Sequence, residues 1–406
     1  MLGITYPLLG NRKDYILWVK VFAFYSVYMT LTNLFIKNPF NDFFVSVDQL
    51  HLYEEAYYLS FQDFRNIIDN TFNFTYIQTP LTYFGHAYIL KLAHLLGASN
   101  DLYFLKLSVV FIGSLIFPVM AKICRIYGVE GKKIEKHILV FAVLSPILCF
   151  SCQILRDVHI CFLFTLMFYV AVHPNLKLKY VWLVLLIVIT YFYRYENGLF
   201  AMLFIGLALM NHMYQTRSAG VKILLFTFAL AGLVVLFGYA ESVMNETFDG
   251  YNARSLDNAD DGSLGAKLML LPFPLNILSK TAFGQMLPFP CWSPLMGGAN
   301  YAFLRIIECF FPFYWIPILL VFIYSLFTLR NKMPQFISVV ILFGFGYIIL
   351  SSASAFDTRR VMAVYPTLFC IYLYIISNYK TPKASYNKIV TGGLFALYLV
   401  YFIIKG

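Results

Sequence analysis

Runs of about 20 apolar residues recur along the whole chain, and this repetition constrains the fold more than any other feature. Each run is long enough to cross a hydrocarbon core of about 30 Å as a helix. A helix satisfies its own backbone hydrogen bonds inside lipid, and the alternating pattern of a membrane β-barrel is absent. Only 12% of the 406 residues are charged, whereas soluble domains carry about 25%. The sequence therefore predicts an all-α, polytopic transmembrane helical bundle.

The apolar runs predict about 11 spans, within a range of about 10–13, in a single integral membrane domain (1–406). These spans cover about 15–36, 103–121, 137–155, 157–173, 179–193, 197–213, 222–242, 309–328, 335–351, 361–378 and 388–404. Two long outer loops are expected, at 37–102 and 243–300. Residues 80–97 are expected to form an interfacial helix in the first of them, with His86, Lys91 and His94 on its polar face.

The charges divide between the two sides of the predicted membrane domain. Of the 20 Asp and Glu residues, all but Asp14, Glu130 and Glu135 can be placed on one side. Lys and Arg gather in short loops that the positive-inside rule makes cytoplasmic, most densely between Lys122 and Lys136. This bias accounts for the net charge of +10 without nucleic-acid binding. We expect a multi-pass protein of a bacterial cytoplasmic membrane, with a cytoplasmic N-terminus.

The first outer loop carries a group of ionisable residues at helical spacing. Asp48, His51 and Glu55 lie at positions i, i+3 and i+7, which share one side of a helix. Two carboxylates and an imidazole on one face could supply a base, a metal ligand and an orienting group. The alternative is the solvated face of a surface helix, which is the commoner origin of such patterns.

Three further outer turns combine arginine with an acid: Arg156–Asp157, Arg194 with Glu196, and Asp357 with Arg359 and Arg360. Positive-inside bias would normally remove arginine from these places. Arginine forks bind phosphate oxygens bidentately, so a polyprenyl phosphate or diphosphate would suit them. Snorkelling and mutual neutralisation at span ends is the alternative for any one turn. Together these clusters favour a membrane-embedded transferase that acts on a lipid-linked substrate at the outer face.

The order of these segments resembles the GT-C superfamily of membrane glycosyltransferases, which includes aminoarabinose transferase and the protein O-mannosyltransferases. The matching segments are Asp48 with Tyr53 and Ala56, Thr79-Pro80-Leu81, Leu96-Gly97 through Lys136, Ser145-Pro146, Leu155-Arg156-Asp157, and Arg360 to Pro366. The resemblance covers about 15–200 and, more loosely, about 350–370. One departure is Gln49, which stands where the commonest family form has a second acid.

The resemblance implies a sugar donor linked to polyprenyl phosphate and a saccharide or lipid-linked acceptor, used in surface polysaccharide or glycoconjugate synthesis. Asp48 would deprotonate the acceptor hydroxyl, and Asp157 would be the second catalytic carboxylate. Arg359, Arg360 and Arg156 would stabilise the leaving phosphate. A divalent ion, Mg²⁺ or Mn²⁺, is left open, with Asp48 and Asp157 as its ligands.

Two other functions stay open on the sequence. Arg156 and Arg194-Tyr195-Glu196 resemble features of Wzy-type O-antigen polymerases, in which arginines would carry the chemistry instead of Asp48. A lipid-linked oligosaccharide flippase or transporter is the third reading. Transporters tend to place ionisable sites near the middle of the membrane, and the predicted spans here are nearly free of charge at their centres.

Overall fold

A computed structural model of the chain describes residues 10–35, 46–72, 79–98, 100–215, 271–272, 275–295, 305–354 and 358–405. Every regular element among them is helical, which confirms the predicted all-α class but not the predicted number of spans. Seven of these helices are long and apolar enough to cross a membrane, and 157–172 and 179–193 are shorter apolar helices. The chain is therefore a multi-pass membrane protein. The predicted span 222–242 and most of the loop 243–300 lie outside the described residues.

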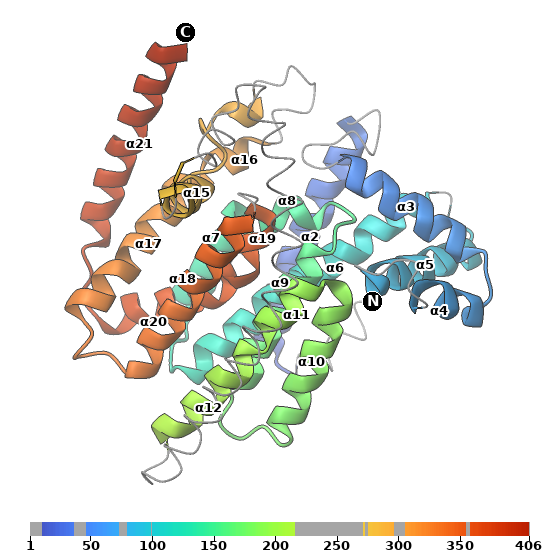
Figure 1. Cartoon of the computed structure of the whole chain (residues 1–406), viewed down its shortest axis with the longest axis horizontal. Helices are drawn as coiled ribbons and strands as arrows, with labels where there is room; N and C mark the ends of the chain where they lie inside the picture. The colour runs from blue at the N-terminus through green and yellow to red at the C-terminus, as the bar shows by residue number, and fades with distance from the viewer. Residues whose placement is uncertain are drawn as a thin grey trace. The chain divides into compact units, whose positions relative to one another are not determined.

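The chain divides into two compact units, and their helices are labelled in Figure 1. Unit 1 comprises 1–126, 130–143 and 147–209, and unit 2 comprises the remainder. The helices of unit 1 are α2 (Arg12–Phe35), α3 (Ser46–Ser60), α4 (Phe64–Phe72), α5 (Pro80–Leu95), α6 (Asp101–Ile126), α7 (Lys132–Leu144), α8 (Ile147–Ser151), α9 (Asp157–Val172), α10 (Lys179–Tyr193) and α11 (Tyr195–Ala201). Helix α12 (Leu203–Gln215) begins in unit 1 and ends in unit 2.

Helix α6 is the centre of unit 1, where it packs against α2 on one side and α9 on the other. Helices α2 and α6 run antiparallel. At one end Asp14 accepts two hydrogen bonds from the Arg125 guanidinium, at 2.9 and 2.5 Å. Towards the other end Lys106 Nζ donates to Asn33 Oδ1 at 3.2 Å. The segment that joins the two helices therefore begins and ends at the end opposite Asp14.

The span predicted at 137–155 is interrupted, which corrects the sequence analysis. Helix α7 ends at Leu144 and α8 begins at Ile147, on either side of Ser145–Pro146. Proline has no backbone N–H, and it disfavours helical geometry in the residue before it. Residues 152–156 then form a turn before α9, so Arg156 lies in a short connecting segment rather than in a tight hairpin between two continuous helices. The span predicted at 197–213 is confirmed as a candidate membrane span, Tyr195–Tyr214, which α11 and α12 form together.

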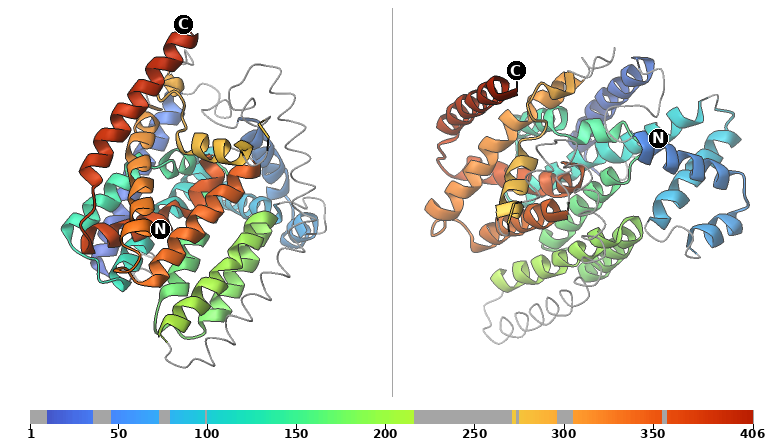
Figure 2. Two further views of the ribbon diagram at one scale, coloured as in Figure 1. Left: turned by 60° about the vertical axis from the view of Figure 1, so that its left-hand side comes forward. Right: turned by 45° about the horizontal axis from the view of Figure 1, so that its top comes forward.

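The helices of unit 2 after α12 are α15 (Leu275–Gln285), η1 (Ser293–Leu295), α16 (Ile306–Cys309), α17 (Phe311–Thr328), α18 (Gln335–Ser354), α19 (Thr358–Val361), η3 (Met362–Val364), α20 (Tyr365–Asn378) and α21 (Lys383–Lys405). Helix α21 packs along α17 (Figure 2). Tyr398 of α21 is buried there against Phe289, Trp292 and Phe313. Phe289 and Trp292, which belong to the Pro-rich stretch 287–294, are thus partly buried within unit 2.

Candidate functional site

Helix α3 presents the acidic group of the first loop, as the spacing predicts. Asp48 and His51 are exposed and Glu55 is half-buried, so all three remain at least partly accessible on one helix. Gln49, the next residue after Asp48, is fully buried. The helix therefore has one face that is fixed in the protein and one that can meet a ligand.

Gln49 connects α3 to the segment that carries Arg156. Its side-chain Oε1 accepts a hydrogen bond from the backbone N–H of Ile154 at 3.3 Å. Buried backbone N–H groups need such partners, and a glutamine oxygen supplies one here without placing a second negative charge beside Asp48. Gln49, which departs from the GT-C pattern, thus connects the helix that carries Asp48 to the turn that carries Arg156.

The hydroxyl of Tyr83, on α5, lies within electrostatic range of charged side chains from α3 and from the 152–156 turn. Burial raises the pKa of Tyr83 above its ordinary value. The positive charge of Arg156 acts in the opposite direction, while the carboxylates of Glu55 and Asp48 raise the pKa further. The His51 ring also lies edge-on to the Tyr83 ring, with centroids 6.2 Å apart. Five residues of α3, α5 and the 152–156 turn are thereby brought together.

Two of the arginine-bearing turns meet in unit 1. Arg194 Nη1 lies 3.5 Å from Asp157 Oδ1, and Arg194 Nε lies 3.3 Å from Glu196 Oε2. The side chains of Arg194 and Asp157 are only 7% and 5% exposed, whereas that of Glu196 is 29% exposed. Arg194 thus holds the start of α9 against the α10–α11 turn. Asp157 is engaged by a cation and is shielded from solvent.

A layer of buried imidazoles lies next to this pair. His86 of α5 is 2% exposed, and neither ring nitrogen has a hydrogen-bond partner among the described residues. Its ring centroid is 6.3 Å from that of His159 on α9, which in turn stacks on Tyr193. Burial, together with the neighbouring His159, lowers the pKa of His86 to about 3. The expected polar face of residues 80–97 is therefore wrong for His86, which faces the interior.

The sequence contains a signal for this burial that periodicity could have found. The buried positions of α5 recur at Tyr83, His86–Ala87, Leu90 and Ala93, which is the spacing of one helix face. His86 falls within that apolar stripe, and its polarity obscured the pattern. Lys91 and His94 lie off the fully buried stripe, as an interfacial helix requires.

Arg359 and Arg360 belong to unit 2, where they form the short helix α19 just before α20. Both are half-buried, and the backbone carbonyl of Arg360 accepts a hydrogen bond from Tyr347 Oη at 3.2 Å. Asp357 lies outside the described residues. The same unit contains a cation that the sequence analysis missed: Lys280 of α15 is 4% exposed, and burial lowers its pKa.

The donor groups in the described part of the chain do not fit a resident Mg²⁺ or Mn²⁺. No group of three or more His, Cys, Asp or Glu side chains among those residues could hold a metal ion. Asp157, one of the two expected ligands, is already paired with Arg194.

Comparison of the chain with protein-family models, with curated proteins and with solved structures finds no match. The residues of α3, α5 and the 152–156 turn are therefore the basis for assigning an activity. Their geometry combines an accessible carboxylate, Asp48, with a guanidinium, Arg156, whose charges both act on the Tyr83 hydroxyl. Such a pair can take up a proton and stabilise a developing anion in the same place.

Proposed function

We propose that the protein is a glycosyltransferase that moves a sugar from a polyprenyl-phosphate donor to an acceptor at the outer face of the cytoplasmic membrane. The observation that carries this proposal is the link between Gln49 and Ile154, because it holds the helix of Asp48 against the turn of Arg156. A general base and a phosphate-binding cation are the two groups that this transfer needs.

The ion pair between Asp14 and Arg125 supports the proposed membrane orientation. Asp14 is one of the few acids expected on the basic, cytoplasmic side, and Arg125 belongs to the most basic loop. Both lie at one end of the α2–α6 pair, so Asp48 follows α2 at the opposite, outer end. In our proposal α2 and α6 are the first two of about 11 spans, and residues 80–97 lie along the outer surface.

Each group has one role in the proposed reaction. Asp48 accepts the proton of the acceptor hydroxyl. At the same time, the oxygen of that hydroxyl forms a bond to the anomeric carbon of the donor sugar. The bond between that carbon and the donor's phosphate oxygen breaks, and the phosphate leaves with the electron pair. Arg156 stabilises the charge that develops on this leaving group. His51 and Glu55, on the same helix face as Asp48, orient the acceptor.

We assign Asp157 and Arg194 a positioning role. The guanidinium of Arg194 is enclosed by two carboxylates, so most of its charge is already balanced inside the protein. This argues against a polymerase mechanism in which Arg194 would bind a lipid diphosphate. Arg359 and Arg360 stay predictions of the GT-C resemblance and take no part in this assignment.

Reconstitution in proteoliposomes with a panel of polyprenyl-phosphate sugars and soluble and lipid-linked acceptors tests the proposal. We expect a covalent product that is one sugar larger than the acceptor, detected by mass spectrometry. A ladder of repeat units made from lipid-diphosphate oligosaccharides would indicate the polymerase. Net translocation of labelled lipid without a covalent product would indicate the flippase. Either result would replace the proposed reaction.

A further inference from the structure

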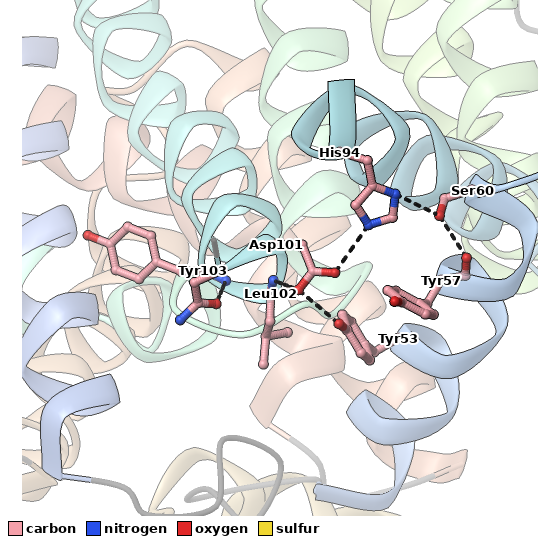
Figure 3. A network of polar contacts seen from close by, with 8 residues as sticks. Tyr53, Tyr57, Ser60, His94, Asp101, Leu102 and Tyr103 are labelled. Carbon is pink, nitrogen blue, oxygen red and sulfur yellow. Dashed lines mark hydrogen bonds and ion pairs between the residues drawn. The ribbon is translucent and has the colours of Figure 1, made fainter. Parts of the chain in front are cut away.

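The polar network at the start of α6 satisfies its own hydrogen-bonding groups (Figure 3). Asp101 accepts a hydrogen bond from Tyr53 Oη at 2.9 Å, and its other oxygen lies 3.3 Å from Nε2 of His94. Nδ1 of His94 lies 3.5 Å from Ser60 Oγ, and the Ser60 hydroxyl donates to a backbone carbonyl. Each of these side chains has a partner within the protein, so the contacts hold α3, α5 and α6 together without a ligand.

Helix α15 in unit 2 differs, because it carries buried donors that lack a partner among the described residues. Nε2 of Gln285 and Oγ1 of Thr281 are both buried, and neither makes a hydrogen bond within that part of the chain. Gln285 as a whole is only 6% exposed. A buried donor without an acceptor costs free energy, so such groups usually bind water or a ligand.

Two neighbouring side chains fix the direction in which the Gln285 amide points. Trp315 Nε1 donates to Gln285 Oε1 at 2.9 Å, and Tyr365 Oη donates to the same oxygen at 3.0 Å. An indole N–H can only donate, so the atom that it contacts is the amide oxygen rather than the nitrogen. The NH₂ group of Gln285 is therefore held in a fixed position as a hydrogen-bond donor.

A third donor, Lys280, lies on the same side of α15. Thr281 and Gln285 are four positions apart, so their side chains are neighbours on the helix. Lys280 directly precedes Thr281, and it belongs with Gly284 and Gln285 to the buried residues of α15. At 3.6 residues per turn, these four positions cover an arc of about 140°. That arc presents three donors and no acidic side chain.

The charge of unit 2 favours an anion as the acceptor. Lys280 brings a positive charge to the buried side of α15, where it is 4% exposed, and this charge selects an anion over a neutral acceptor. Glu308 is the only carboxylate in the described part of unit 2. Arg305 donates to both oxygens of Glu308, at 3.0 and 2.9 Å. The described residues of unit 2 thus have an excess of positive charge.

The contacts of Gln285 place it towards one side of the membrane. Trp315 and Tyr365 lie in the first halves of the candidate spans Ile306–Thr328 and Thr358–Asn378. One span, Gln335–Ser352, separates these two in the sequence, so both begin on the same side. Gln285 bonds to both side chains and therefore lies nearer to that surface. Lipid phosphates are abundant oxyanions there, and basic sites between spans bind such headgroups.

We propose that Lys280, Thr281 and Gln285 of α15 form a binding site for a phosphate group, carried by a lipid or free in solution. The phosphate oxygens accept hydrogen bonds from the Gln285 amide and the Thr281 hydroxyl, and Lys280 supplies the positive charge. The site shares no residue with the proposed transferase site. This inference does not depend on the proposed transferase activity.

Two near-isosteric substitutions test the site with little change in packing. Gln285→Glu replaces the amide NH₂ by a carboxylate oxygen and keeps an acceptor for Trp315 and Tyr365. Thr281→Val removes the hydroxyl donor. The matched control is Gln335→Glu, which makes the same change of charge at an exposed position at the start of α18.

The delipidated protein in a neutral detergent is titrated with three probes, and the shift of the unfolding midpoint gives each apparent affinity. The probes are dioctanoyl phosphatidic acid, sodium phosphate at constant ionic strength, and dioctanoylglycerol, which has the same acyl chains without phosphate. We expect phosphatidic acid to bind the native protein and Gln335→Glu equally. We expect an affinity at least about tenfold lower for Gln285→Glu and several-fold lower for Thr281→Val.

The probes also distinguish the two sources of phosphate. Binding of sodium phosphate together with phosphatidic acid would support a site that is open to solution, whereas binding of phosphatidic acid alone would assign the site to a lipid. Equal stabilisation by phosphatidic acid and dioctanoylglycerol would overturn the proposal, because only the acyl chains would then bind. An unchanged affinity in both Gln285→Glu and Thr281→Val, or no shift with either phosphate probe, would also overturn it.

The unfolding midpoint without ligand shows whether each variant folds. Thr281→Val loses no hydrogen bond within the described part of the chain, so it gives the test even where Gln285→Glu does not fold.

Discussion

Gln49 and Ile154 are 105 positions apart in the sequence, and a hydrogen bond of 3.3 Å joins the glutamine side chain to the isoleucine backbone N–H. The bond is buried, so water cannot replace either partner. It fixes the beginning of α3, where Asp48 is exposed, to the turn that carries Arg156. A neutral amide here can accept the N–H without adding a charge next to the carboxylate.

Replacing Gln49 by leucine should destabilise the protein by about 1–3 kcal/mol, because the buried N–H of Ile154 loses its acceptor. The thermal unfolding midpoint in detergent, followed by tryptophan fluorescence, measures this loss. Gln62→Leu is the matched control, since its hydrogen bond with Asn70 is exposed, and we expect a change within about 0.5 kcal/mol. Equal changes in the unfolding midpoint for the two substitutions would show that the Gln49 hydrogen bond does not stabilise the protein.

The buried pair of Arg194 and Asp157 should be strongly cooperative. Removing Arg194 leaves Asp157 as a buried charge without this cation, which typically costs about 3–5 kcal/mol, whereas removing Asp157 leaves Arg194 with Glu196 as its carboxylate. We expect Arg194→Met and Asp157→Leu to lower the unfolding midpoint strongly, and the double variant to be more stable than the sum of the single effects implies. Additive losses in this double-mutant cycle would show that the two side chains act independently.

Substitution of His86 by leucine should stabilise the protein. The imidazole is buried without a hydrogen-bond partner among the described residues, so an apolar side chain of similar volume removes a desolvation cost of about 1–3 kcal/mol. We expect a higher unfolding midpoint at neutral pH. A lower midpoint would indicate that a ligand or bound water uses the ring nitrogens.

The same substitution should change the response to acid. In the unfolded chain His86 binds a proton below its ordinary pKa of 6.5, whereas the buried ring stays neutral down to about 3. The free energy of unfolding of the native protein therefore falls as the pH drops from 6.5 towards 3. The leucine variant lacks this contribution and should lose less stability over that interval. If the free energy of unfolding of the leucine variant depends on pH as steeply as that of the native protein, His86 is protonated in the folded protein.

The positions of the helices were largely predictable, because apolar runs and basic loops dictate where a chain can cross lipid. Helices α9, α10 and α18 begin within one or two residues of the predicted spans. Pro146 also indicates the break between α7 and α8. Hydropathy alone predicts a single span there, because the chain is apolar on both sides of the proline. Arg305 and Glu308 lie three positions apart and form an ion pair with charged atoms 2.9 Å apart, as helical spacing allows.

The arrangement of the site was less predictable, because it depends on contacts between residues far apart in sequence. The sequence places Asp157 next to Arg156, and only the fold shows that Arg194 lies beside it as well. Gln49 marks only a departure from a motif until Ile154 supplies its N–H. His86 is a polar residue of the kind expected on a solvated helix face. It is buried because α5 packs against α10 and α6.

Membrane orientation gives a prediction that is independent of activity. Single cysteines at Asp48 and Arg156 should react with a membrane-impermeant maleimide added outside intact cells, whereas one at Lys133 should react only after lysis. This prediction rests on the charge bias of the loops and on the pairing of Asp14 with Arg125 at the same end of α2 and α6. Labelling of positions 48 and 156 from opposite sides would separate the two halves of the proposed site.

The most direct test of the account is the rate of sugar transfer by Asp48→Asn in the reconstituted assay. A general base typically contributes 10²–10⁴-fold, so we expect at least about a hundredfold loss with an unchanged unfolding midpoint. Glu54→Gln, an exposed carboxylate on another side of α3, is the matched control and should transfer at the wild-type rate. Transfer by Asp48→Asn at a rate equal to that of Glu54→Gln would contradict the proposed mechanism.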